Sequence, residues 1–250
     1  MTTLEKSWLD PPASPTLAAD EVHVWRIALN RPPRDVQEIQ NLLASEEISR
    51  AGRFHFEKDR QRFVVVRGLL RVILGRYLGL RPGQLHFIYS DYGKPALAPA
   101  PATRAALSFN LSHAHELALV AVTRDRQLGI DLEHIRPIPE VEQIAKRIFS
   151  PQEKEMFRAL TETEKLEVFF SYWTCKEAYI KARGEGLSLS LDQFQVVPVL
   201  GEAAPMLGVK GDPQEASRWS LRELVPAPGY LAALAVEGKG WRLAQWNYSD

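Results

Sequence analysis

Cysteine, net charge and long apolar runs are all scarce in this chain of 250 residues. Cys175 is the single cysteine, which excludes a disulfide within the chain and fits a reducing compartment. The 31 basic and 31 acidic residues give a formal net charge of zero. A protein that coats nucleic acid needs a basic excess, so we expect no nucleic-acid partner. The length suffices for one large domain or two small ones.

The most apolar segment, residues 63–80, is interrupted by Arg67, Arg71 and Arg76. Charges at these positions exclude a membrane-spanning helix. The first twenty residues contain no apolar run of the signal-peptide type. We therefore expect a soluble, cytoplasmic protein with no membrane partner.

The order of the elements follows from the spacing of apolar residues. Residues 21–29 alternate as a strand does, and residues 34–54 have helical spacing. Residues 59–80 predict a long amphipathic helix, residues 89–97 a turn, and residues 106–122 two strands around a polar turn. A helix over 168–183 with a glycine-bounded loop and a strand over 230–236 repeat this order more faintly. Either two related halves or a chance similarity between helix–strand units gives this pattern.

The stretch GIDLEHIRP, residues 129–137, contains two carboxylates on one side of a predicted strand. Alternation places Ile130 and Leu132 on one face, and Asp131 and Glu133 on the other. Neighbouring carboxylates repel each other, which raises the pKa of one of them or costs stability. The arrangement therefore indicates a cation between them.

The predicted helix through SYWTCKEAYIKARG contains a third carboxylate. Trp173, Glu177 and Lys181 are spaced i, i+4 and i+8 and so share one face. An isolated Glu–Lys pair at this spacing usually only supports a helix. Together with Asp131 and Glu133, however, Glu177 completes a set that suits Mg²⁺, which takes carboxylates, water and substrate phosphate. Cys175 lies on the opposite side of the helix, where a buried structural thiol is expected.

A phosphate ligand would also need cations and hydrogen-bond donors. Lys181 lies one helical turn from Glu177, and YGKP places Lys94 on a turn. Each is a weak signal alone, because most such lysines are only solvated and most lone histidines are structural. The run NLSHAH adds four polar side chains: Asn110, Ser112, His113 and His115.

Taken together, two motifs resemble a known family. GIDLE, followed 44 residues later by WTCKEAYIK, resembles the signatures G-[IV]-D-x-E and W-x-x-K-E-[AS]-x-x-K of 4′-phosphopantetheinyl transferases. Further matches (RFHFEKDRQRF, YGKPAL, FNLSH, RIFSPQE and GEGLSLSLDQFQV) extend over most of the chain. The length resembles the large, surfactin-synthetase-activating (Sfp) type. The holo-acyl-carrier-protein synthase type is about half as long and forms trimers.

The resemblance implies an α+β fold with two similar α/β halves related by a pseudo-two-fold axis. Each half is a small, mainly antiparallel sheet packed with a long helix. We place the halves at residues 1–122 and 123–250. Because one chain of this type contains both halves, we expect a monomer with coenzyme A bound in the cleft between them.

The resemblance also implies residue roles. Asp131 and Glu177 would bind Mg²⁺, with Glu133 a third ligand directly or through water. Lys181 and the metal would hold the pyrophosphate of coenzyme A, and the family's catalytic residues match Asp131, Glu177 and Lys181. The remaining coenzyme A contacts would come from Arg50, Arg53, Arg62, Lys94, Asn110, Ser112 and His113, with His113 at the 3′-phosphate. Trp173 would serve packing, and Glu47 departs from relatives with a lysine near the 3′-phosphate.

The implied reaction is transfer of 4′-phosphopantetheine. A serine hydroxyl of an apo acyl or peptidyl carrier protein attacks the β-phosphate of coenzyme A, and 3′,5′-ADP leaves. Either Glu177 or a metal-activated water would accept the serine proton. The sequence does not identify the carrier protein.

Three other functions fit the pattern less well. Many Mg²⁺-dependent nucleases place a lysine two residues after a glutamate, but Ile135 stands two residues after Glu133. A glycoside hydrolase would leave Lys94, His113 and Lys181 without a role. A non-catalytic coenzyme A-binding module would not require the catalytic set, which is complete here.

Overall fold

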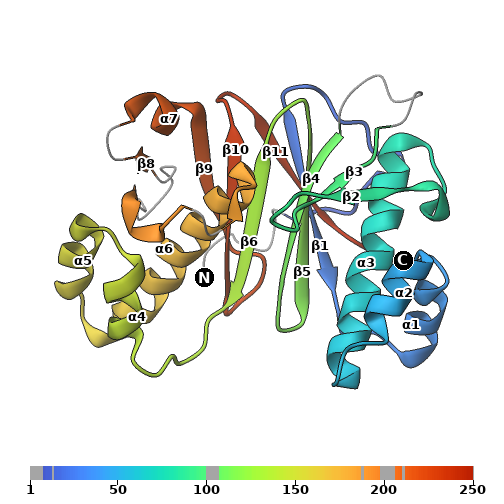
Figure 1. Cartoon of the computed structure of the whole chain (residues 1–250), viewed down its shortest axis with the longest axis horizontal. Coiled ribbons are helices and arrows are strands. Elements are labelled where there is room, and N and C mark those ends of the chain that lie inside the picture. Colours follow the sequence, from blue (N-terminus) through green and yellow to red (C-terminus); the bar gives the residue numbers. More distant parts are fainter. Residues whose placement is uncertain are drawn as a thin grey trace.

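The computed structural model describes residues 8–12, 14–99, 107–186, 189–197, 206–209 and 212–249. Two β-sheets lie in the middle of the molecule, and helices cover their two outer sides (Figure 1). The elements up to the middle of the chain are β1 (Glu21–Ala28), α1 (Pro33–Gln40), α2 (Ser45–Ala51), α3 (Glu57–Leu78), η2 (Pro82–Gln84), β2 (Phe87–Tyr89), β3 (Pro95–Leu97), β4 (Leu107–Ala114) and β5 (Leu117–Arg124).

The second part of the chain repeats this order. Its elements are β6 (Leu128–His134), α4 (Val141–Ile148), α5 (Pro151–Arg158), α6 (Glu162–Arg183), η4 (Leu191–Gln193), β7 (Phe194–Val197), β8 (Met206–Val209), α7 (Pro213–Arg218), β9 (Trp219–Leu224), β10 (Tyr230–Glu237) and β11 (Arg242–Asn247). The first sheet has the order β11-β1-β5-β4, and the second has the order β6-β10-β9. The antiparallel set β1-β5-β4 thus corresponds to β6-β10-β9, which confirms the predicted α+β fold with two similar halves.

The last strand belongs to the first sheet. β11 pairs with β1 in parallel, and Glu21 lies opposite Arg242. The predicted boundary between residues 122 and 123 falls inside β5. The division into residues 1–122 and 123–250 stays a prediction, and it assigns the last two residues of β5 to the second half.

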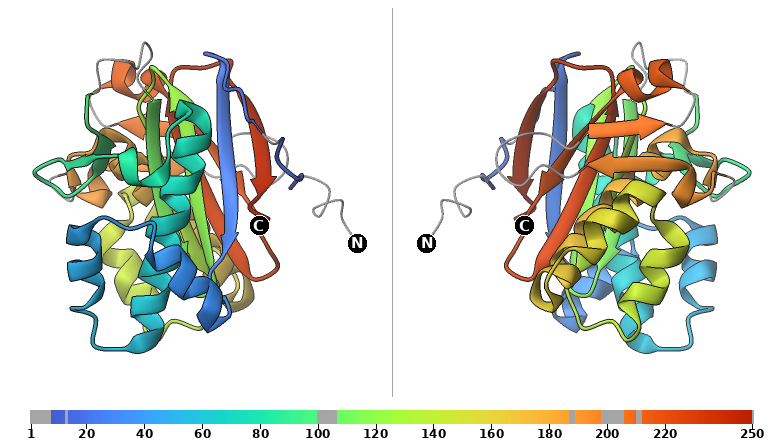
Figure 2. Two further views of the ribbon diagram at one scale, coloured as in Figure 1. Left: turned by 90° about the vertical axis from the view of Figure 1, so that its right-hand side faces the viewer. Right: turned by 90° about the vertical axis from the view of Figure 1, so that its left-hand side faces the viewer.

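Each sheet is covered by one long helix, as the two side views show (Figure 2). Both α3 and α6 contain 22 residues. Each ends at a glycine in the left-handed region, Gly79 with φ 65° and Gly184 with φ 74°. A residue without Cβ adopts this conformation at low cost, so these glycines set the ends of both helices.

The helical spacing over residues 34–54 corresponds to two helices rather than one. The chain leaves α1 after Gln40, and Ala44 is extended with ψ 159°. In this conformation the Ala44 N–H donates to Glu47 Oε2 at 3.0 Å. This side-chain cap starts α2 and so divides the segment. Residues 89–97, predicted as a turn, include the turn of the β2–β3 hairpin.

The alternation in β6 separates core from site. Ile130 and Leu132 are buried in the apolar layer between the two sheets, where Val22 and Val24 also lie. Asp131 points to the other side, toward α6. A Cβ on Gly129 would lie 2.2 Å from the Ala178 carbonyl oxygen, so glycine lets β6 approach α6 closely. No helix in the described residues has the length and apolar character to span a membrane.

Candidate active site

Asp131 and Lys181 form an ion pair where the two halves meet. Lys181 Nζ, on α6, lies 2.6 Å from Asp131 Oδ1 on β6. Ser112, on β4 of the first half, donates from Oγ to the same carboxylate oxygen at 3.1 Å. Asp131 is 5% exposed. The GIDLE strand, the KEAYIK helix and the NLSH strand therefore each supply one of these three groups.

Glu177 and Glu133 complete the set of carboxylates. Burial raises the pKa of Glu177, and the negative charges of Asp131 and Glu133 raise it further, against the opposing effect of Lys181. Glu133 forms an ion pair with Arg136 at 3.1 Å. The ionised form of Glu177 is therefore disfavoured, and an added cation would favour it.

The predicted metal site can be tested against the donors. Among the described residues, no group of three or more His, Cys, Asp or Glu side chains is arranged to hold a metal ion. Asp131 and Glu133 instead pair with Lys181 and Arg136. Oδ2 of Asp131, however, is buried and has no hydrogen-bond partner in the described part of the chain. An orphaned carboxylate oxygen and oxygen-only donors fit Mg²⁺, and the ion stays a prediction.

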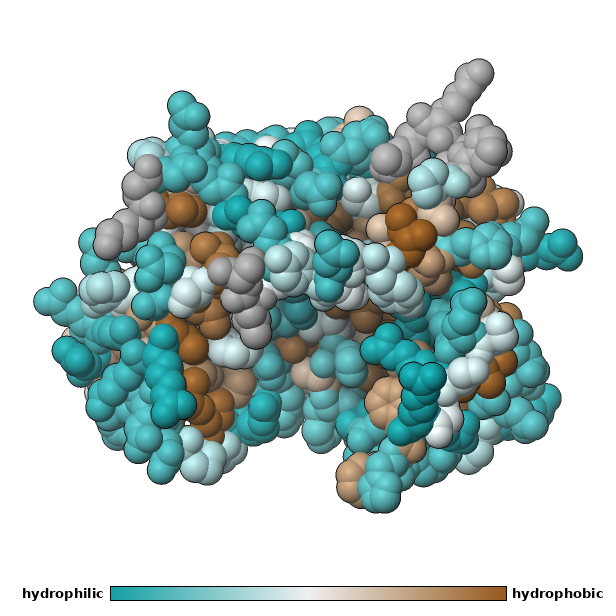
Figure 3. Space-filling view, viewed as in Figure 1, coloured by the Kyte–Doolittle hydropathy of each residue, from teal (hydrophilic) through white to brown (hydrophobic). Residues whose placement is uncertain are grey.

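A pocket of about 590 Å³ joins most of the predicted ligands. Its walls come from α2, α3, the β2–β3 hairpin, β4, β6 and α6, and it contains Arg50, Arg62, Ser112, His113, Asp131, Glu133 and Lys181. Two neighbouring pockets share lining residues with it. One, of about 270 Å³, contains Lys94, Asn110 and Glu177, and the other, of about 790 Å³, contains Arg53. We call the three pockets together the groove. The space-filling view shows the molecule hollowed between two lobes (Figure 3).

His113 lines the groove and is exposed. Partial burial of its ring lowers the pKa of His113, and the positive charges of Lys181 and Arg62 lower it further. Near the ring these two cations outweigh the opposing negative charge of Asp59, and this balance would favour an anion. A bound phosphate would offset those charges and would favour the protonated imidazole.

Lys94 and Asn110 line the groove, but their polar groups bind the main chain. Lys94 Nζ donates to the carbonyl oxygens of Leu128 at 3.1 Å and Ala182 at 3.0 Å. Burial lowers the pKa of Lys94 to about 8. Asn110 Oδ1 accepts from the Ile130 N–H at 2.9 Å. Both side chains tie the first half to the second, a role that the resemblance did not indicate.

Glu47 is a structural residue. Its carboxylate lies 2.7 Å from Arg67 Nη2 and 2.6 Å from Arg71 Nε. Arg67 also donates to the Tyr89 hydroxyl at 2.8 Å, so this network fixes the groove wall. This network was not predicted from the sequence, where its signal is two arginines one turn apart in an otherwise apolar helix.

The predicted packing roles hold. Cys175 is fully buried, and burial raises the pKa of its thiol well above the usual value. Trp173 stacks on Phe169, with ring centroids 6.3 Å apart and an angle of 14° between the planes. Cys175 thus packs on the buried side of α6, whereas Trp173 is half-buried one turn before Glu177, on the side of the helix where Glu177 and Lys181 face the groove.

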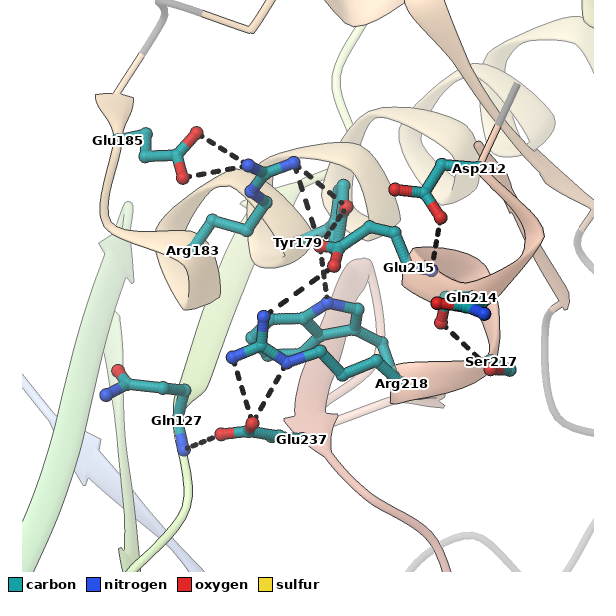
Figure 4. Close-up of polar contacts among 11 residues, drawn as sticks. Gln127, Tyr179, Arg183, Glu185, Asp212, Gln214, Glu215, Ser217, Arg218 and Glu237 are labelled. Carbon is teal, nitrogen blue, oxygen red and sulfur yellow. Dashed lines mark hydrogen bonds and ion pairs between the residues drawn. The ribbon is translucent and has the colours of Figure 1, made fainter. Parts of the chain in front are cut away.

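A polar network holds the C-terminal turn of α6 from its outer side (Figure 4). Arg183 pairs with Glu185 at 2.8 Å and with Glu215 at 3.6 Å. Glu215 also accepts from the Tyr179 hydroxyl at 2.9 Å. Arg218 links the network to Glu237 on β10 at 2.9 Å. The turn that follows Lys181 is therefore anchored to α7 and to the second sheet.

Comparisons with known proteins agree with the motifs. Residues 30–125 match the family described as "4′-phosphopantetheinyl transferase, N-terminal", and residues 127–235 match the "4′-phosphopantetheinyl transferase superfamily". The chain is 46% identical to the 4′-phosphopantetheinyl transferase HetI of Nostoc sp. over 245 residues, which covers 98% of this chain and 100% of that protein.

Two other similar proteins are more distant. The 4′-phosphopantetheinyl transferase Sfp of Bacillus subtilis is 30% identical over 175 residues, 69% of this chain and 75% of that protein. Among solved structures, the holo-[acyl-carrier-protein] synthase of Thermotoga maritima is 25% identical, with a TM-score of 0.36. That likeness covers 46% of this chain and 64% of the other.

Proposed function

The chain belongs to the 4′-phosphopantetheinyl transferase superfamily, and we propose that its groove binds coenzyme A and transfers the phosphopantetheine arm to a serine of an apo carrier protein. The observation that carries this proposal is the Lys181–Asp131 ion pair in a groove that also contains Arg50, Arg62 and His113. Cations along the groove suit the phosphates of coenzyme A, and the carboxylates beside Lys181 suit Mg²⁺.

The chain's own residues would bind and orient the reactants. Lys181 would contact the pyrophosphate, and His113 with Arg50, Arg53 and Arg62 would bind the remaining phosphate charge. Asp131, Glu177 and Glu133 would hold Mg²⁺, which offsets the charge that develops on the phosphoryl oxygens. Fixed cations around a transferring phosphoryl group supply most of the catalysis in this class of reaction.

The attacking serine must lose its proton. Glu177 is the side chain of the groove whose pKa is raised by burial and by Asp131. A carboxylate with a raised pKa is a better general base than an ordinary one. Glu177 is therefore one candidate acceptor; Mg²⁺ held by Asp131, Glu177 and Glu133 would supply the other by lowering the pKa of water. The leaving group would be 3′,5′-ADP.

One chain supplies all of these groups. Ser112 and His113 come from β4 of the first half, while Asp131 and Lys181 come from the second half. We therefore propose that a monomer is active, and that its specific activity does not fall on dilution. Sedimentation would detect an obligate trimer, which would contradict this proposal.

Incubation with coenzyme A, Mg²⁺ and a panel of apo carrier proteins tests the function directly. Each carrier that serves as acceptor should gain the mass of phosphopantetheine, and 3′,5′-ADP should appear in equal amount. A carrier with its acceptor serine replaced by alanine is the control. Binding of coenzyme A without transfer to any carrier would favour a non-catalytic module, and cleavage of nucleic acid would favour a nuclease.

A further inference from the structure

We propose that Lys94 is a positioning residue, which holds the catalytic helix and the carboxylate strand together and does not bind phosphate. This inference rests on the proposed transferase function. Lys94 belongs to the first half, but both acceptors of its ammonium, the carbonyls of Leu128 and Ala182, belong to the second. A single side chain thus joins the β2–β3 hairpin to β6 and α6.

The two acceptors lie next to the active site along the chain. Ala182 directly follows Lys181, and its carbonyl is one of the last four of α6, which have no partner within the helix. A cation near these carbonyls is also favoured by the helix dipole. Leu128 begins β6, three residues before Asp131. Lys94 therefore links the helix that contains Lys181 to the strand that contains Asp131.

The main chain at Lys94 is itself held firmly. The Lys94 N–H donates to Ser90 Oγ at 3.1 Å, and the Ser90 N–H donates to the Lys94 carbonyl at 3.0 Å. Gly93, the preceding residue, lines the two pockets of the groove of about 270 Å³ and 590 Å³. A ligand seated against Gly93 is therefore coupled through Lys94 to the Lys181–Asp131 pair.

The ammonium is also poorly placed for a phosphate. To reach a phosphate, the ammonium would have to break its hydrogen bonds to both carbonyls, and those carbonyls would then lack a donor. Lys94 is half-buried, and this burial lowers the pKa of its ammonium to about 8. The exposed His113 and Arg50 stand in the groove instead.

Kinetics of Lys94→Met separate the two roles. Methionine keeps most of the aliphatic stem and removes the donors. We expect kcat to fall by about 10-fold or more, because a small displacement of reacting groups costs up to about 10²-fold. KM for coenzyme A should stay within about twofold of the wild-type value. The preference for coenzyme A over 3′-dephospho-coenzyme A should also stay within about twofold of the wild-type ratio. Lys94→Arg, which keeps charge and donors, should recover part of kcat. Lys58→Met, which removes an exposed lysine of the same half, is the matched control.

Hydrogen exchange provides a readout that does not depend on activity. The amides of the last turn of α6 should exchange faster in Lys94→Met than in Lys58→Met. A raised KM with loss of the 3′-phosphate preference and unchanged kcat would identify Lys94 as a phosphate ligand and overturn the proposal. Unchanged exchange would overturn it as well. If the wild type modified no carrier protein, the transferase function would fail, while the exchange measurement would still decide the role of Lys94.

Discussion

In both halves of the molecule, a buried ion pair of the same design holds the long helix in place. The fifteenth residue of each helix is a buried cation, Arg71 in α3 and Lys176 in α6. Each pairs with a glutamate, Glu47 at 2.6 Å and Glu153 at 2.9 Å. Both glutamates also accept a main-chain N–H that starts the preceding short helix. Each cation then donates to two carbonyls of the loop that follows its helix.

The halves differ at one position where the first strand of each half, β1 or β6, faces the long helix, α3 or α6. Trp25 lies opposite Val120, the fourth residue of β5, and Asp131 lies opposite Ala233, the fourth residue of β10. The twentieth residue of each helix meets this position: Arg76 stacks over Trp25 at 5.7 Å, whereas Lys181 pairs with Asp131. The same framework therefore holds a packed aromatic side chain in one half and a reactive carboxylate in the other.

The strongest test of this difference removes the carboxylates. We expect Asp131→Ala and Glu177→Ala each to abolish transfer without unfolding the protein, because each removes a ligand from a cluster that repels itself when empty. Glu133→Ala should have a smaller effect if Glu133 binds through water. Glu223→Gln is the matched control, since Glu223 also lies opposite Ala233 and accepts from Ser171 on α6, outside the groove. Full turnover by Asp131→Ala at low Mg²⁺ would contradict the proposal that Asp131 is a ligand of Mg²⁺.

Breaking the buried ion pair should affect the halves unequally. Lys176→Met leaves Glu153 buried without its cation and should cost about 3–5 kcal/mol of unfolding free energy. Arg71→Met should cost less, because Glu47 keeps Arg67 at 2.7 Å. Denaturant unfolding measures both. Adding Glu153→Gln to Lys176→Met should recover part of the loss. A larger loss of unfolding free energy for Arg71→Met than for Lys176→Met would mean that Arg67 does not stabilise the buried Glu47.

The 3′-phosphate preference should depend on His113. His113→Ala removes one charge-assisted hydrogen bond, which is worth roughly 1.5–3 kcal/mol, or about 10- to 100-fold in preference for coenzyme A over its 3′-dephospho form. Steady-state kinetics with both substrates measure this ratio. His115→Ala is the control, because the His115 ring stacks on His134 at 4.7 Å instead. An unchanged ratio in His113→Ala would place the contact elsewhere.

The smallest expected effect is a gain in stability. The pKa of Glu177 is raised in the folded protein, so its ionised form at neutral pH destabilises the fold. Glu177→Gln should therefore raise Tm at pH 7, by about 2–4 °C for each kcal/mol gained. The gain should shrink as the pH falls toward the ordinary glutamate range, where wild-type Glu177 becomes protonated. Glu155→Gln, an exposed neighbour in the same half, should change nothing. An equal or lower Tm for Glu177→Gln at pH 7 would contradict the prediction.

The sequence predicted features that depend on local spacing. The faces of β6 follow from alternation at Ile130, Asp131 and Leu132, and the helix predicted to end at residue 183 ends there, before Gly184. The paired motifs placed Asp131 and Lys181 in one site, and the structure brings them together as an ion pair. These predictions succeed because each depends on a few neighbouring residues or on a motif read as a unit.

Features that depend on distant partners were not predictable. The sequence indicated Lys94 as a coenzyme A contact, and nothing near it in the chain reveals that its ammonium donates to the carbonyls of Leu128 and Ala182. The division between α1 and α2 depends on the Glu47 cap, which competes with the helical spacing of the apolar residues. The pairing of β11 with β1 joins residues about 220 positions apart and has no local signal.

That pairing has a consequence for synthesis of the protein. Nascent chains leave the ribosome from the N-terminus, and domains usually fold as they emerge. Here the first sheet receives its edge strand only when residues 242–247 have appeared, after both long helices. Contacts of such sequence separation also close slowly. The N-terminal half therefore keeps one side of β1 open until residues 242–247 have been synthesised and can pair with it.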